Sequence, residues 1–391
     1  MVALVALGPR YEFHYAFLFL LVLIGPLWIG AFGRFRLGRL VAFAVLITAF
    51  WGYYLAQLSS ATHLVSAAHA RDDTMLLIGA LCGIGVILWA RTVLTTAQIG
   101  ICYGVGLLLD TVISPVGTSN PWKFVYAVPV TILVLGLAAR STRTGPAIVA
   151  MVALAGLSVV LDCRSYSTAL LLAALLSTWR SLPQRSGKSK SWALTATMIG
   201  AVSVAIFLLI QSLLVNGYLG AAAQERTIQQ INVSGSLILG GRPELEASLA
   251  LFGNHPAGFG VGVVPSPQDI LVAKSGLSSI NYAPDNGYVE KYMFGYQYEL
   301  HSVAGDVWAK WGLLGLALVV GIAMLVVRTL AMSIANRSGE PLVLFLCCWT
   351  SWSLAFSPLV ASLPIIVPTV AMCLRSRVGG ADCAPAHDAS G

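Results

Sequence analysis

Charged side chains are scarce in this sequence. Asp, Glu, Lys and Arg make up only 10% of the 391 residues, whereas 57% are hydrophobic. A soluble domain typically carries about 25% charged residues, so water is excluded as the solvent for most of the surface. The mean hydropathy of +0.82 is typical of a polytopic membrane protein.

Other signals are missing as well. The N-terminus has no basic stretch followed by a small-residue cleavage site, so we expect no cleavable signal peptide. The net charge of +7 is spread in short clusters between apolar runs, a pattern that encodes membrane orientation rather than nucleic-acid binding. The seven cysteines lack metal-ligand or disulfide spacing, which predicts small buried hydrophobes: Cys82, Cys102, Cys163, Cys347, Cys348, Cys373 and Cys383.

What the sequence does contain is a series of apolar runs. A helix needs about 20 apolar residues to cross a bilayer, and eleven runs approach this length. They lie near 13–32, 39–57, 75–91, 93–110, 122–139, 145–161, 165–179, 192–215, 303–327, 341–356 and 358–374. We therefore predict an all-α integral membrane protein with about eleven transmembrane helices. Residues 1–377 would form one membrane domain, and the tail at 378–391 is predicted to be disordered.

The basic clusters predict the orientation of these helices. They fall near 34–39, 140–143, 180–190, 328–337 and 375–377. With eleven spans all of them lie on one face, which would be the cytoplasmic one. The N-terminus would then lie outside, together with a long loop at 216–301 between the eighth and ninth helices. This loop is large enough to roof a cavity.

Arg164, in "LDCRSYSTALLLAALL", lies at the predicted outer mouth of the seventh helix, against the general distribution of basic residues. It can be interpreted as an arginine that reaches the lipid headgroups and pairs with Asp162. It can also be interpreted as an anion site, because a guanidinium at a helix N-terminus adds its charge to free backbone donors.

A second motif, "ILGGRPELEASLALFGNHPAGFGVG", places Arg242 before a predicted helix in the external loop. Pro243 suits the first helical position, and the helix is expected to end around Asn254. A flexible glycine-rich turn is expected to follow. "GFGVG" by itself is weak evidence of phosphate binding, because neither a preceding strand nor a following helix is expected here.

The stretch "NYAPDNGYVEKYMFGYQYELH" is rich in aromatic residues just before the ninth helix. One interpretation is an aromatic belt at the membrane interface. The other is a platform for sugar rings, with Tyr288, Tyr292 and Tyr296 as candidate sugar-binding residues.

His301 is predicted to begin the ninth helix at the outer face. A helix N-terminus disfavours imidazolium, which would keep the ring neutral and able to accept a proton. Asp306 and Lys310 follow at a spacing of four, so an ion pair within the helix is their simplest interpretation.

Three features, in this order, resemble the O-antigen ligase family, which includes related bacterial polysaccharide polymerases. They are "CRSYSTALL" at a helix start, "GGRPELEASLALFGNHPAGFGVG" in a long external loop, and "LHSVAGDVWAKWGLLGL" entering the next helix. The resemblance covers roughly residues 120–330. Its most specific part is the histidine followed eleven residues later by Gly-Leu-Leu-Gly.

The resemblance implies a multi-helix glycosyltransferase of the C type in the bacterial cytoplasmic membrane, with its active site facing outside. Such an enzyme takes a glycan from an undecaprenyl-(pyro)phosphate carrier and moves it to an acceptor hydroxyl on a glycan or glycolipid, without a metal or another cofactor. Arg164 and Arg242 would bind the (pyro)phosphate, and His301 would activate the acceptor. The motifs leave open whether the chain is a ligase or a polymerase.

Two alternatives remain. Asp72 and Asp73, in "ARDDTM", lie in the predicted external loop after the second helix and could be the base and metal ligands of a metal-dependent polyprenyl-phosphate-sugar glycosyltransferase. The simpler interpretation of this pair is two solvated carboxylates beside Arg71. The second alternative is a flippase or transporter of lipid-linked glycans without catalysis, although the sequence shows neither a duplicated half nor a charged pathway at the midplane.

Overall fold

The computed structural model describes residues 25–113, 117–181, 220–234 and 242–377, with scattered residues between 197 and 218. Within these ranges the regular structure is helical, and the β-structure consists of two isolated bridges. The elements are α3 (Gly25–Arg34), α4 (Gly38–Ser59), α5 (Ala67–Ala90), α6 (Thr96–Ile113), η1 (Trp122–Tyr126), α7 (Ala127–Ala138), α8 (Gly145–Val160), α9 (Arg164–Ser181), α11 (Ala221–Ser234), α13 (Glu244–Asn254), α14 (Pro267–Ser279), η2 (Val289–Met293), α15 (Val303–Asn336), α16 (Pro341–Phe356) and α17 (Leu359–Cys373).

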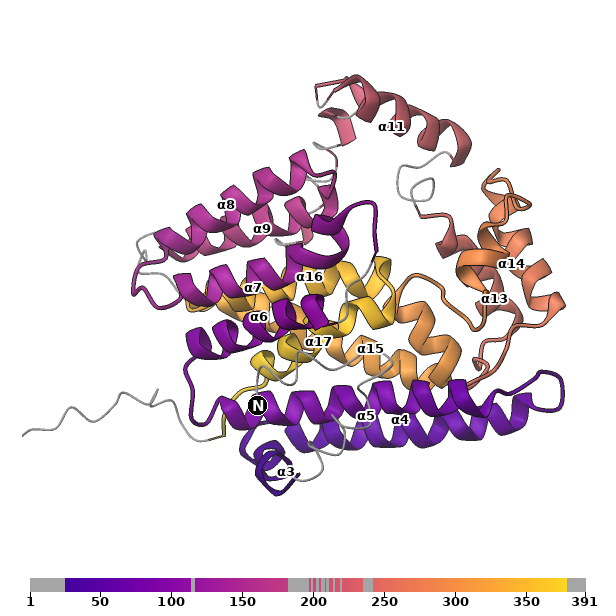
Figure 1. Ribbon diagram of the computed structural model, residues 1–391, viewed down its shortest axis with the longest axis horizontal. Helices are drawn as coiled ribbons and strands as arrows, with labels where there is room; N and C mark the ends of the chain where they lie inside the picture. Colours follow the sequence, from indigo (N-terminus) through magenta and orange to yellow (C-terminus); the bar gives the residue numbers. More distant parts are fainter. Residues whose placement is uncertain are drawn as a thin grey trace, which may run out of the picture.

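The long helices pack side by side (Figure 1). Helix α6 packs on α7 and α8 on α9, while α16 lies against α9, α15 and α17. Helix α15 also packs on α4. Helices α13 and α14 pack on each other at one end of the molecule (Figure 1).

Four helices are long and apolar enough to cross a membrane: α4, α5, α6 and α15. Four shorter apolar segments, 122–138, 145–160, 341–356 and 359–373, accompany them. Nine of the eleven predicted runs coincide with helices in this set or with α9. The run at 13–32 lies within the described residues only from Gly25, and the run at 192–215 and the tail at 378–391 lie largely or wholly outside them. The all-helical prediction is confirmed for the described chain, while the number of eleven spans remains a prediction.

Helix α5 begins earlier than predicted. Its first residue is Ala67, eight positions before the predicted start of the run at 75, because Ser66 caps it by accepting a hydrogen bond from the backbone N–H of His69. Asp72 and Asp73 therefore lie within a helix and not in a loop. The prediction of a loop was wrong here. The polar residues of "HARDDT" suggested a loop, but the segment is helical and its charged side chains have partners.

The segment "GFGVG" is firmly packed, which corrects the expected flexible turn. Phe259 and Val261 are fully buried. The backbone N–H groups of Phe259 and Gly260 both donate to the carbonyl of Ala309 in α15, at 2.9 and 3.1 Å. The N–H of Val261 donates to the carbonyl of Gly52 in α4 at 3.2 Å. The loop is thus inserted among three helices and its backbone polar groups are satisfied there.

Glycine is required where this loop meets its neighbours. Gly260 has a φ of +111°, and a Cβ added there would lie 2.2 Å from the backbone nitrogen of Ala56. Gly312 has a φ of +60° and interrupts α15 with a kink, and a Cβ there would lie 2.2 Å from the carbonyl oxygen of Ala257. The kink and the loop fit each other, which fixes the start of α15 against this loop.

Most cysteines behave as the sequence predicts. Cys82, Cys163, Cys347, Cys348 and Cys373 are free and buried, whereas Cys102 is exposed. Cys383 lies outside the described residues.

Candidate functional site

Arg242 and His301, which are far apart in the sequence, belong to one connected cluster. Arg242 precedes α13, and its Nη1 donates to Oε1 of Glu244 at 3.3 Å. The other carboxylate oxygen of Glu244 accepts a hydrogen bond from the hydroxyl of Tyr288 at 3.4 Å. The rings of Tyr288 and His301 lie 6.3 Å apart, centroid to centroid. We call Arg242, Glu244, Tyr288 and His301 the Arg–His cluster.

Glu244 connects Arg242 to Tyr288, a role that its position in the sequence does not reveal. Its side chain is buried, at 4% exposure, whereas Arg242 is 33% exposed. A buried carboxylate needs a cation and hydrogen-bond donors, and Arg242 and Tyr288 supply them. Among the described residues the guanidinium contacts Glu244 through one nitrogen, and a guanidinium has further N–H groups that can bind an anion.

His301 has a backbone conformation and a hydrogen bond that orient its ring. It precedes α15 by two residues, with Ser302 as the helix cap, and has a φ of +54°. Its Nδ1 lies 3.0 Å from the carbonyl oxygen of Glu299. A carbonyl can only accept, so Nδ1 carries the proton, and in the neutral ring Nε2 is left as a proton acceptor.

Asp306 fixes the backbone next to His301. Its buried carboxylate accepts the N–H of Leu300 at 2.6 Å and the N–H of Leu359 at 2.8 Å. The residue before His301 is thereby tied to the first turn of α15 and to the start of α17. The expected ion pair between Asp306 and Lys310 is not the arrangement found, because the two side chains have other partners.

Lys310 forms an ion pair with Asp73. Its Nζ donates to Oδ1 of Asp73 in α5, and both side chains are buried, at 7% and 5% exposure. The other oxygen of Asp73 accepts the N–H of Gly262. Asp72 is exposed and lies 3.6 Å from Arg71. The interpretation as solvated carboxylates thus holds for Asp72 and was wrong for Asp73.

The tyrosine-rich stretch divides into an accessible part and a core part. Tyr288 contacts Tyr282 and Tyr292, with centroids 6.2 and 5.6 Å apart. Tyr292 and Tyr296 are 62% and 82% exposed. By contrast Tyr298 is buried and stacks on Phe259 at 4.2 Å. Tyr292 and Tyr296 are therefore accessible to a ligand, whereas Tyr288 is partly buried within the Arg–His cluster, where Tyr292 contacts it.

Tyr288 keeps its proton at neutral pH. Burial raises the pKa of its hydroxyl above the ordinary value of 10.0, and the neighbouring carboxylate of Glu244 raises it further. Tyr288 consequently acts as a hydrogen-bond donor and does not compete with His301 as a base.

Arg164 lies at the start of α9, as predicted. Its Nε is 3.3 Å from Oδ1 of Asp162, and both side chains are well exposed. Asp162 has a φ of +52° in the tight turn between α8 and α9. The described contacts give Arg164 this local partner and do not join it to the Arg–His cluster.

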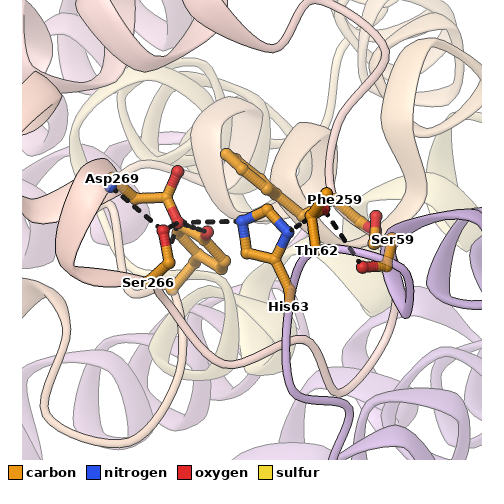
Figure 2. A network of polar contacts seen from close by, with 7 residues as sticks. Ser59, Thr62, His63, Phe259, Ser266 and Asp269 are labelled. Carbon is orange, nitrogen blue, oxygen red and sulfur yellow. Dashed lines mark hydrogen bonds and ion pairs between the residues drawn. The ribbon is translucent and has the colours of Figure 1, made fainter.

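A second polar network, which the sequence analysis missed, connects the turn after α4 to the start of α14 (Figure 2). His63 Nε2 lies 3.0 Å from Oδ2 of Asp269. Asp269 and Ser266 form a capping box at the start of α14. Ser266 followed three residues later by Asp269 is the one signal in the sequence that predicts this helix start.

Comparisons with protein-family models, with curated proteins and with solved structures return no match for this chain.

Proposed function

We propose that the protein is a membrane glycosyltransferase that moves a glycan from an undecaprenyl-(pyro)phosphate donor to an acceptor hydroxyl at the outer face of the bacterial cytoplasmic membrane. The observation that carries this proposal is the Arg–His cluster: a histidine with Nδ1 hydrogen-bonded to a carbonyl shares one cluster with an arginine that is 33% exposed. Its partners would be a lipid-linked oligosaccharide, a glycan or glycolipid acceptor, and membrane lipids.

The chemistry follows from these groups. Nε2 of His301 accepts the proton of the acceptor hydroxyl while that oxygen attacks the anomeric carbon of the donor. The bond from this carbon to the phosphate oxygen breaks, and its electron pair leaves with the (pyro)phosphate. The guanidinium of Arg242 stabilises the departing negative charge. A single displacement of this kind inverts the anomeric configuration and uses no metal.

Arg164 is proposed as a second cation for the carrier. Its partner Asp162 is 59% exposed, and a pairing between exposed charges contributes little free energy. The phosphate of a carrier can therefore replace Asp162 at small cost.

Two observations count against the metal-dependent alternative. Asp73 is buried and its two oxygens are occupied by Lys310 and by the backbone of Gly262. Asp72 is exposed beside Arg71. A metal ion at Asp73 would have to displace the buried ammonium of Lys310, which already neutralises this carboxylate.

The test is glycan transfer in membranes from cells that carry His301→Ala, Arg242→Ala or Arg164→Ala, at matched protein level and with or without EDTA. We expect transfer to fall at least a hundredfold for His301→Ala, since general base catalysis typically contributes about 10²–10⁴. Arg242→Ala and Arg164→Ala should also lose transfer, while EDTA should have no effect.

The matched control is Arg71→Ala, which removes an exposed arginine with a local carboxylate partner, as Arg164→Ala does. It should retain transfer. Retained transfer in the His301 and Arg242 variants, or abolition by EDTA, would refute the assignment. Translocation of the lipid-linked glycan without transfer by the reconstituted protein would favour a flippase instead.

A further inference from the structure

Three metal-ligand side chains converge outside the Arg–His cluster. They are His63 in the turn after α4, His255 at the end of α13, and Asp269 in the first turn of α14, and their ligand atoms all lie within 4.8 Å of one another. The side chains of His63 and Asp269 are only 5% and 1% exposed. Three segments of the external part thus place two imidazoles and one carboxylate around one point.

The contacts of His63 turn its Nε2 toward Asp269. Its Nδ1 lies 2.8 Å from Oγ1 of Thr62, and that hydroxyl donates to the carbonyl of Ser59 at 3.3 Å. The Thr62 hydroxyl thus orients the ring, and Nε2 faces Asp269 (Figure 2). Metal-binding histidines are commonly oriented in this way, by donating the other ring N–H to an oxygen.

Asp269 is also held in place as a ligand. Oδ2 accepts hydrogen bonds from the N–H and hydroxyl of Ser266, at 2.7 and 2.6 Å, and from the hydroxyl of Tyr298 at 2.9 Å. The carboxylate is therefore oriented before any cation arrives.

We propose that His63, His255 and Asp269 bind a divalent transition-metal ion, with Zn²⁺ as the best fit. Two imidazoles and one carboxylate are a ligand set that zinc uses, with water in the fourth position. Bonds of about 2.0–2.2 Å place two tetrahedral zinc ligands about 3.3 Å apart. Nε2 of His63 and Oδ2 of Asp269 are already 3.0 Å apart.

The ion would take the place of the direct contact between His63 and Asp269. His255 would add the third ligand. Since His63 and Asp269 contact each other directly without the ion, the fold does not require it. The metal would reinforce the connection between the turn after α4 and the helices α13 and α14. Tyr298, which holds Asp269, lies three positions before His301.

The experiment uses the full-length protein, purified in detergent and stripped with EDTA. Zn²⁺ is titrated against a chromophoric chelator, and the Tm is measured with and without Zn²⁺. We expect one high-affinity ion per chain and a Tm that rises with Zn²⁺ and falls again with EDTA. Co²⁺ in place of Zn²⁺ should give visible d–d absorption typical of four-coordinate nitrogen and oxygen ligands.

Variants distinguish this site from adventitious binding. His255→Ala should weaken Zn²⁺ binding at least tenfold, and Thr62→Val, which keeps all three ligands, should weaken it about tenfold through the orientation of His63. The control His69→Gln removes a histidine outside the site and should bind Zn²⁺ like the wild type. Equal affinity in wild type and His255→Ala, or a Tm that does not respond to Zn²⁺, would overturn the proposal.

The proposed glycan transfer and the proposed metal site can be refuted independently of each other. His301→Ala should lose glycan transfer and retain Zn²⁺ binding, while His255→Ala should lose Zn²⁺ binding. If wild-type protein transfers glycan and binds no Zn²⁺, only the metal site is wrong. If it binds Zn²⁺ through His255 and His301→Ala still transfers glycan, only the proposed catalysis is wrong.

Discussion

The φ of +54° at His301 puts a bulky residue in a region that costs free energy for side chains other than glycine, asparagine and aspartate. The surroundings compensate, because the neighbouring N–H of Leu300 is held by Asp306 and Nδ1 is held by the carbonyl of Glu299. Strain of this kind is found where a side chain must be presented at a fixed angle. Here it places the imidazole beside the ring of Tyr288 in the Arg–His cluster.

This geometry predicts that the base can be removed without disturbing the fold. In His301→Asn the new residue tolerates a positive φ, and its amide N–H can replace Nδ1–H as donor to Glu299. It has no group that accepts the proton of an alcohol. We expect the Tm to stay within about 2 °C of the wild type while transfer falls about 10²–10⁴-fold. Thermal unfolding and a transfer assay on the same preparation measure both quantities.

His301→Gly is the companion variant for this prediction. Glycine adopts the same φ freely but supplies neither a donor nor a base. If His301→Asn keeps substantial transfer while His301→Gly loses it, the hydrogen bond to Glu299 is what matters, and the role of His301 is structural.

The packing of the "GFGVG" loop between helices is sensitive to a single added methyl group. Gly260→Ala would bring a Cβ to 2.2 Å from the backbone of Ala56, at a φ of +111°. Backbone strain and overpacking each typically cost about 1–3 kcal/mol. We expect a destabilisation of about 2–4 kcal/mol, measured by chemical or thermal unfolding in detergent.

Gly253→Ala is the matched control for this prediction. Gly253 lies in helix α13, and a Cβ there would meet nothing within 4 Å. Alanine is favoured over glycine inside a helix by about 1 kcal/mol, so this variant should be neutral or more stable. Equal stability of the two variants would mean that the loop is not inserted between the helices.

The sequence predicts the helices far better than it predicts their partners. Apolar runs reveal where a chain can enter a bilayer, which is why α15 and α16 begin where expected. The start of α5 was missed because its Asp73 is acceptable in a buried position only through Lys310, more than two hundred positions away. The packing of "GFGVG" likewise depends on α4 and α15, and no local pattern contains that information.

The same limit applies to the candidate site. Arg242 and His301 are recognisable from motifs, but the carboxylate of Glu244 that connects Arg242 to Tyr288 appears in the sequence only as a residue of a helix start. His63 and His255 are nearly two hundred positions apart and come together only in the folded chain. Residues that act with neighbours in sequence can be predicted, whereas residues that meet through the fold cannot.

The proposed orientation predicts which residues a membrane-impermeant reagent can label in intact cells. Ser278 in α14 and Ser141 in the turn after α7 are both exposed, and the proposal places them on opposite sides of the membrane. In a background without Cys102 and Cys383, a membrane-impermeant maleimide should label Ser278→Cys in intact spheroplasts. Ser141→Cys should react only after permeabilisation. Labelling of both variants in intact spheroplasts would contradict the orientation.

The buried pair of Asp73 and Lys310 also has a consequence for the order of biosynthesis. The two residues are 237 positions apart, which at roughly 5–20 residues per second is a delay on the order of tens of seconds. During that time the carboxylate of Asp73 lacks the cation that pairs with it in the folded chain. An unpaired charge in a buried position is costly, so the amino-terminal half is only provisionally assembled until α15 arrives. A ribosome that stops before Lys310 would release a chain that carries this defect, and membrane quality control could recognise incomplete copies by it.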